Sequence, residues 1–269
     1  MSLEVIKFVS QSLAEGLAVA LIVLSESGPG APGMTGWIMA VREDGRQMGT
    51  IGGGPVEAKV VSEGRKILAE ASSRVFPFDY SLREGGELGA ICGGEARGLI
   101  TVLRPPNRLI IFGGGHVGRK IYEAGLVAGF EVVMVEDRPE YTSQFPKAKV
   151  VMTENLGSTA RQLDLNQDCY LVIVTRNHVE DYSVLSATIE SQAAYIGLIG
   201  SRTKVSKLFG RLREQGVAEE QLRRIHSPIG LAIDDGTPGE IALAIMAEIL
   251  CVKNKITALA HSRDQRPTP

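Results

Sequence analysis

The spacing of hydrophobic residues changes part-way along the chain and separates two differently patterned segments. In the first segment, helical spacing precedes a short apolar run, and a hairpin pattern follows. Strands are expected at 17–24, 37–41, 46–51, 74–79 and 99–103, and helices at 3–15 and 55–71. The apolar face of the first helix is expected to consist of Leu3, Ile6, Val9 and Leu13. This mixture predicts a smaller α+β domain at 1–104.

The second segment alternates short apolar runs with helical patterns, which is typical of a parallel sheet. Strands are expected at 109–112, 132–135, 171–174 and 195–199, and helices near 116–128, 155–163, 180–191 and 202–215. Because these strands are apolar throughout, helices should cover both faces of the sheet. The pattern predicts an α/β, Rossmann-like domain at 105–252, followed by a polar tail at 253–269 that we expect to be disordered.

Charge and composition exclude several classes of function. Lys and Arg number 29 and Asp and Glu 31, so a net charge of −2 offers no basic surface for nucleic acid or an anionic membrane. The longest apolar run is far shorter than a membrane span, and the first residues lack the pattern of a signal peptide. We therefore expect a cytoplasmic protein. The 3 cysteines lack C-x-x-C spacing and indicate neither a disulfide framework nor structural zinc.

Glycine is in excess, with 31 residues where roughly 19 would be typical. The strongest local signal is the G-x-G-x-x-G motif of Gly113, Gly115 and Gly118, which follows an apolar strand and opens a helix. In dinucleotide-binding folds these glycines allow a tight turn, close approach of a pyrophosphate and close helix packing. His116 lies inside this loop, where the helix N-terminus offers free N–H groups.

An acidic pair, Glu136 and Asp137, ends the next expected strand and is followed by Arg138. A carboxylate at this position binds the ribose in dinucleotide folds, so the pair favours an unphosphorylated 2′-hydroxyl, as in NAD. The alternative is a Rossmann-like scaffold that binds no nucleotide, because a fold does not fix a function.

A second glycine cluster, Gly52, Gly53 and Gly54, also joins a strand to a helix, and Glu57 follows it. Successive N–H groups in such a loop can form a nest that binds an anion, although a tight structural turn is at least as good an interpretation.

The third cluster of glycines surrounds Cys92, whose thiolate would suit a soft metal or sulfur chemistry. A small buried apolar side chain explains Cys92 about equally well. Ser201 and Arg202 follow the last strong strand and are candidate ligand contacts, but an ordinary helix cap also accounts for Ser201.

The order of these motifs resembles the xanthine dehydrogenase accessory factor family, XdhC/CoxI. The motifs are Gly-Thr-Ile-Gly-Gly-Gly-x-x-Glu at 49–57, Cys-Gly-Gly at 92–94, Phe-Gly-Gly-Gly-His-Val at 112–117, Glu-Asp-Arg-Pro at 136–139, Tyr-Ile-Gly-Leu-Ile-Gly-Ser-Arg at 195–202, and Ser-Pro-Ile-Gly-Leu with Thr-Pro-Gly-Glu-Ile-Ala within 227–242. The resemblance implies a chaperone that binds molybdenum cofactor, as molybdopterin or a dinucleotide form. It also implies protection of the cofactor while a cysteine desulfurase sulfurates it, and delivery to an apo molybdenum hydroxylase, with a homodimer expected.

Two departures from the family pattern concern contacts rather than the fold. The segment 25–36 lacks the arginine of the family's Gly-Ser-x-Pro-Arg stretch, and Thr175-Arg176 replaces Thr-His, with His178 following. Two other functions compete with the chaperone. The G-x-G-x-x-G motif also fits an NAD-dependent oxidoreductase, although no Tyr-x-x-x-Lys pair is evident, and it fits a nucleotide-sensing module without chemistry.

Overall fold

The chain divides into two compact units, Met1–Pro105 and Pro106–Pro269. The computed structural model describes residues 2–28, 31, 33–70, 75–81 and 95–256. Cys92 and residues 257–269 of the expected disordered tail lie outside these residues, whereas Lys253, the first residue of that tail, is the last residue of a helix. Within them, no helix has the length and apolar character needed to cross a membrane.

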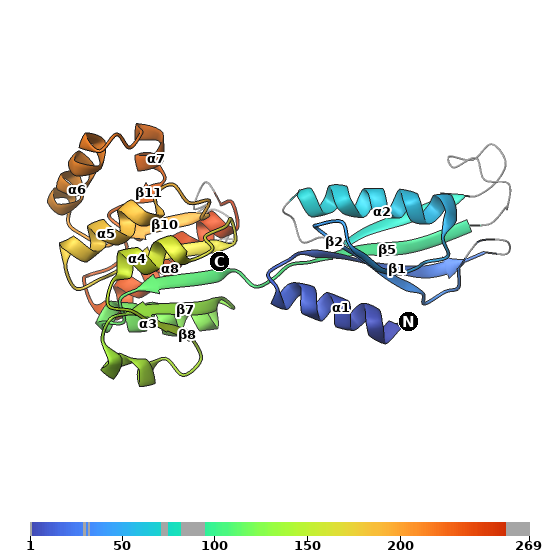
Figure 1. The fold of residues 1–269 in the computed structure, drawn as a ribbon, viewed down its shortest axis with the longest axis horizontal. Coiled ribbons are helices and arrows are strands. Elements are labelled where there is room, and N and C mark those ends of the chain that lie inside the picture. The colour runs from blue at the N-terminus through green and yellow to red at the C-terminus, as the bar shows by residue number, and fades with distance from the viewer. Residues whose placement is uncertain (1, 29–30, 32, 71–74, 82–94, 257–269) are drawn as a thin grey trace, which may run out of the picture. The chain divides into compact units, whose positions relative to one another are not determined.

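The described residues of the first unit form a five-stranded antiparallel sheet with one helix on each face (Figure 1). Its elements are α1 (Ser2–Ala14), β1 (Val19–Ser27), β2 (Ile38–Arg42), β3 (Gln47–Gly49), α2 (Gly54–Ala69), β4 (Val75–Ser81) and β5 (Glu95–Leu103). The strand order is β3-β2-β1-β5-β4. Alternate residues of β1 point to opposite faces: Ala20 and Ile22 pack in the cluster under α2, whereas Val19 packs in the cluster under α1.

The buried face of α1 differs in part from the one expected. Leu3 and Ile6 are 66% and 51% exposed, whereas Val9 is buried as expected and Leu13 packs partly buried against the cluster under α1; the helix also buries Val5 and Ser12. Val5, Val9 and Ser12, spaced i, i+4 and i+7, share one side of a helix. A serine is tolerated there because its hydroxyl donates a hydrogen bond to the carbonyl four residues earlier, at 2.7 Å. The apolar residues of α1 therefore extend beyond the side of the helix that packs against the sheet.

The second unit is a six-stranded parallel sheet with helices on both faces, as expected. Its strands are β6 (Arg108–Phe112), β7 (Glu131–Glu136), β8 (Lys149–Met152), β9 (Cys169–Ile173), β10 (Tyr195–Leu198) and β11 (Ile225–His226). Its helices are α3 (His116–Val127), the 3-10 helix η1 (Pro139–Gln144), α4 (Leu156–Gln162), α5 (His178–Thr188), α6 (Arg202–Glu214), α7 (Glu219–Arg223) and α8 (Pro238–Lys253).

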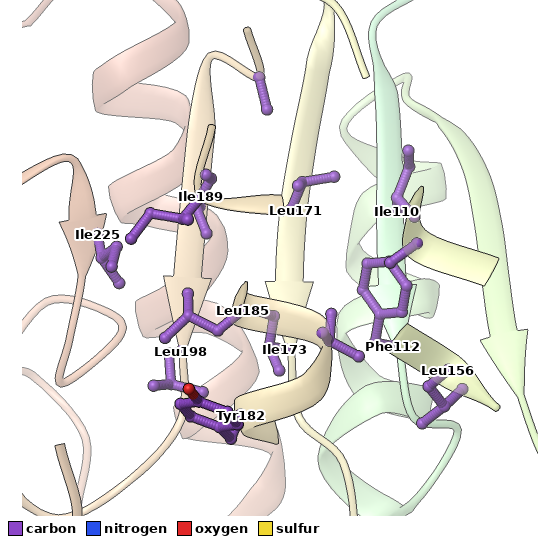
Figure 2. Close-up of a cluster of buried hydrophobic side chains, with 14 of the residues drawn as sticks. Ile110, Phe112, Leu156, Leu171, Ile173, Tyr182, Leu185, Ile189, Leu198 and Ile225 are labelled. Carbon is purple, nitrogen blue, oxygen red and sulfur yellow. The ribbon is translucent and has the colours of Figure 1, made fainter. Parts of the chain in front are cut away.

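The sheet order is β11-β10-β9-β6-β7-β8: β7 and β8 follow on one side of β6, and β9, β10 and β11 follow on its other side, so the strand order reverses between β6 and β9. This is the Rossmann order, in which ligands bind at the carboxyl ends of the strands near the reversal. On one face, α4, α5 and α6 cover a cluster that includes Phe112, Leu171 and Tyr182 (Figure 2). On the other face, α3 and α8 cover a second cluster. The fold therefore places the loop after β6 beside the loop after β9.

Candidate functional site

The glycine loop after β6 is shaped first by the chain's own packing. Gly113 has a φ of 110°, in the region that favours glycine, and a Cβ there would lie 2.5 Å from the carbonyl oxygen of Val174. A Cβ on Gly118 would lie 1.9 Å from the carbonyl oxygen of Gly113. Both glycines are therefore required for folding, whatever the loop binds.

Gly115 has a different role. Its φ is −66°, which any residue adopts, and a Cβ there would meet nothing within 4 Å. Gly115 is also the N-cap of α3 and provides no side-chain cap, and the first turn of α3 holds no acidic residue. His116 follows as an exposed residue. The N-terminus of α3, with the positive end of its helix dipole, therefore has neither a side-chain cap nor an acidic residue in its first turn, which is an arrangement suited to a phosphate.

Glu136, the last residue of β7, binds this loop from within the protein. Its side chain is 1% exposed, and Oε2 accepts a 2.5 Å hydrogen bond from the N–H of Gly114. Oε1 accepts bonds from the backbone N–H groups of Asp137 and Arg138, at 2.9 and 3.1 Å. The guanidinium of Arg138 donates to both oxygens, at 2.8 and 2.9 Å. Burial opposes ionisation, but these donors outweigh it and lower the pKa of Glu136 to about 2.

The carboxylate expected to bind a ribose is thus used by the chain itself. Glu136 has the ribose-binding position at the strand end, but its oxygens are turned inward. Asp137 lies beside it and pairs with Arg176, at 2.5 Å. Burial and a side-chain hydrogen bond with Glu136 raise the pKa of Asp137, while the charge of Arg176 acts in the opposite direction. Arg138 also stacks on the ring of Tyr141, with its guanidinium carbon 4.0 Å from the ring centre.

The structure therefore brings the glycine loop and the residues 136–138 together at one edge of the sheet. Sequence reasoning missed Arg176 and Tyr141 as members of this group. In the sequence, Arg176 stands out only as a departure from the family's Thr-His after β9, and Tyr141 follows the acidic pair without belonging to a motif. The pairing of Arg176 with Asp137 depends on the strand order, which places β9 and β7 on either side of β6.

The glycine cluster before α2 already holds a carboxylate of the chain. Glu57 Oε2 accepts hydrogen bonds from the N–H groups of Ile51 and Gly53, at 2.9 and 3.0 Å, and from the Thr50 hydroxyl, at 2.5 Å. Burial opposes ionisation of Glu57, but these donors prevail and lower its pKa. Gly52 donates to the Thr50 hydroxyl instead. The sequence left open an anion-binding nest or a tight structural turn, and in the structure two N–H groups of this loop bind the carboxylate of Glu57.

The remaining candidates take separate positions. Ser201 is the N-cap of α6, and its hydroxyl accepts a long hydrogen bond, 3.4 Å, from Lys204 N–H. Arg202 begins α6 as an exposed residue, and its side chain forms no hydrogen bond or ion pair with any other residue the structure describes. Among the described residues, no three His, Cys, Asp or Glu side chains are grouped to hold a metal. Cys92, the candidate metal ligand, lies outside that set.

Comparison with known proteins places this Rossmann-type unit in a family. The pattern of the XdhC Rossmann domain matches residues 109–249, and that of the XdhC and CoxI family matches residues 12–79. The chain therefore belongs to the XdhC and CoxI family.

Several curated proteins and solved structures are similar to the chain. The uncharacterised Escherichia coli protein YqeB is 38% identical over 80% of this chain and 40% of its own length. A probable xanthine dehydrogenase subunit from Bacillus subtilis is 26% identical over 60% of this chain and 47% of its own. This chain therefore spans less than half of each of those two proteins.

The molybdenum cofactor insertion chaperone PaoD of E. coli is 22% identical, and the similarity covers 93% of this chain and 88% of PaoD. A crystal structure of a xanthine dehydrogenase from Bacillus halodurans has a TM-score of 0.51 at 20% identity, covering 94% of this chain and 96% of that one. This match supports the fold of both units.

Proposed function

We propose that this chain binds molybdenum cofactor, protects it during sulfuration and delivers it to an apo molybdenum hydroxylase of the xanthine dehydrogenase type. Membership of the XdhC and CoxI family supports this function. Similarity to PaoD supports it further, because it extends over nearly the whole of both chains. In this proposal the chain binds and transfers the cofactor and is not itself a catalyst.

The observation that carries the proposal is the open space at Gly115. Molybdopterin ends in a phosphate, and its dinucleotide forms contain a pyrophosphate. An N-terminus of α3 without a side-chain cap suits either group, and the missing Cβ of Gly115 leaves room for it. The molybdenum centre would be supplied by the cofactor, while the chain would hold the phosphate through N–H groups between Gly115 and Gly118.

Other residues are proposed to act around this contact. His116 and Arg138 would line the same edge of the sheet, and Asp137 would orient Arg176 there. Ser201 and Arg202 are candidate contacts at the end of the neighbouring strand β10. Glu57 would hold the loop of Gly52, Gly53 and Gly54 in shape. We retain Cys92 as a candidate ligand for the metal of the bound cofactor, and NAD as the alternative ligand of the glycine loop.

The proposal names two partners besides the cofactor. An apo molybdenum hydroxylase would receive the cofactor, and a cysteine desulfurase would supply sulfur while the chain holds it. A homodimer is proposed as the assembly.

Pterin fluorescence tests the proposal directly. The full chain is produced in cells with an intact molybdopterin pathway, purified and oxidised, and the pterin released is measured per chain. We expect a stoichiometric amount. Gly115→Val should remove most of it, because the added side chain would occupy the space proposed for the phosphate. Gly210→Val is the matched control, since a Cβ at Gly210 also meets nothing within 4 Å.

Absence of pterin from the wild-type chain, together with saturable binding of NAD, would overturn the proposal in favour of a nucleotide-binding module. Equal pterin in Gly115→Val and Gly210→Val would leave cofactor binding intact but remove the glycine loop from it. A shortage of pterin in both variants would indicate a general loss of folding. Circular dichroism would detect that loss as a decrease in secondary structure.

A further inference from the structure

A cationic pocket lies beside the candidate site, between the start of α5 and one side of α6. Its volume is about 730 Å³, within the range of small-molecule sites. The basic residues that line it are Arg176, His178, Lys204, Lys207 and Arg211, and none of its lining residues is acidic. Lys204, Lys207 and Arg211 are spaced i, i+3 and i+7, so one face of α6 supplies most of the charge.

Four Lys and Arg side chains line the pocket, and two of them pair with a carboxylate of the protein. Arg176 pairs with Asp137, and Lys204 Nζ lies 2.5 Å from Asp181 Oδ2. Lys207 and Arg211 form no ion pair with any residue that the structure describes. Both are exposed on the same side of α6. The pocket consequently has two cations available for an external anion.

Contacts behind the pocket fix its shape. Asp181 is completely buried and also accepts a 2.7 Å hydrogen bond from the Thr175 hydroxyl, so one carboxylate joins the end of β9 to α6 through Lys204. The guanidinium carbon of Arg211 lies 3.9 Å from the centre of the Tyr182 ring. That ring belongs to the core cluster beneath α5 (Figure 2). Arg211 is therefore held on a buried support, which lowers the entropy cost of binding an anion.

We propose that this pocket is a second binding site, for a small phosphorylated ligand whose phosphate is bound by Lys207 and Arg211. Thr203 also lines the pocket and offers a hydroxyl group for the rest of the ligand. A concave pocket of this volume fits a small molecule, because an acidic protein segment would call for a longer and flatter basic surface.

This site is distinct from the glycine loop in the way it would bind its ligand. Side chains cap both helices that border the pocket: Asn177 accepts hydrogen bonds from two N–H groups of α5, and Ser201 accepts one from α6. The anion would therefore be bound by side-chain charges, not by uncapped helix N–H groups as proposed for α3. The inference stands on the pocket alone and does not require the chain to bind molybdenum cofactor.

Calorimetric titration with inorganic pyrophosphate at low ionic strength tests this site in the full chain. We expect Lys207→Gln with Arg211→Gln to weaken binding at least about tenfold, because each lost charge removes a charge-assisted hydrogen bond. The matched control is Lys59→Gln with Lys66→Gln, which removes the same charge from the exposed surface of α2 in the other unit. Gly115→Val separates the two proposed anion sites.

Pyrophosphate binding that survives in the α2 control and in Gly115→Val, but is lost in the α6 double variant, would establish the site. Binding lost only in Gly115→Val would overturn the inference, since the anion would then occupy the glycine loop. Equal losses of pyrophosphate binding in the α6 double variant and in the α2 control would also overturn the inference, because binding would then depend only on net charge. A hexaglutamate peptide that binds through Lys207 and Arg211 where pyrophosphate does not would replace the small ligand by an acidic protein partner.

Discussion

Glu136→Gln should destabilise the second unit more than any surface substitution of the same kind. The change keeps the size of the side chain but removes a buried charge that accepts five hydrogen bonds, two of them from the Arg138 guanidinium. The pKa of Glu136 lies at about 2 against an ordinary 4.5. At about 1.4 kcal/mol per unit, this difference corresponds to about 3 kcal/mol, similar to the typical cost of breaking a buried ion pair.

Denaturant unfolding measures this loss. Trp37 is the only tryptophan and lies in the first unit, so its fluorescence follows that unit alone, whereas far-ultraviolet circular dichroism follows both. We expect Glu136→Gln to shift the dichroism transition and to leave the Trp37 transition in place. Glu123→Gln is the matched control. Its ion pairs with Lys120 and Arg119 are on the surface, and their loss should cost less than about 1 kcal/mol.

The difference in stability between wild type and Glu136→Gln should also depend on pH, in a direction that the pKa of Glu136 fixes. Because the folded-state pKa of Glu136 is lowered, its contribution is fully present above about pH 4.5 and disappears as the pH falls toward about 2. The stability difference between wild type and Glu136→Gln should therefore be constant near neutrality and decrease below about pH 4.5. A Glu136→Gln protein no less stable than Glu123→Gln at neutral pH would refute the reasoning.

Two further substitutions test the glycine loops. Gly118→Ala should destabilise the second unit by more than about 2 kcal/mol in dichroism-monitored unfolding, because its Cβ would lie 1.9 Å from the Gly113 carbonyl oxygen; a fully stable variant would contradict the packing described. Glu57→Ala should lower the stability followed by the Trp37 transition by about 1–2 kcal/mol, since two backbone N–H groups and a hydroxyl lose their acceptor; an unchanged transition would show that water replaces the carboxylate without cost.

The architecture of the second unit could be predicted from the sequence because its central strands are continuous apolar runs between helical patterns. Strands β6, β7, β9 and β10 fall within a few residues of the expected positions. The edge strands β8 and β11 were missed. Each has few residues and only a partly apolar pattern, so its conformation depends on pairing with a neighbour rather than on its own composition.

The candidate site was predictable only in part. The loop of Gly113 to Gly118 was found because a motif marks it, and the structure shows why its glycines differ in purpose. The inward turn of Glu136 was not predictable. A carboxylate at a strand end suits a ribose or a neighbouring arginine equally well, and only the approach of Arg138 and Gly114 decides between them. Likewise, the basic face of α6 is visible in the sequence, but its pocket depends on how α6 packs against α5.

The hydrogen bond between Glu136 and Gly114 has a consequence for kinetics. One buried carboxylate joins the loop after β6 to the end of β7, so these two segments cannot change shape independently. A ligand arriving at Gly115 would meet a surface that folding has already ordered. Association should then proceed without a slow conformational step, and any control over the release of a ligand would have to come from another part of the chain or from a partner protein.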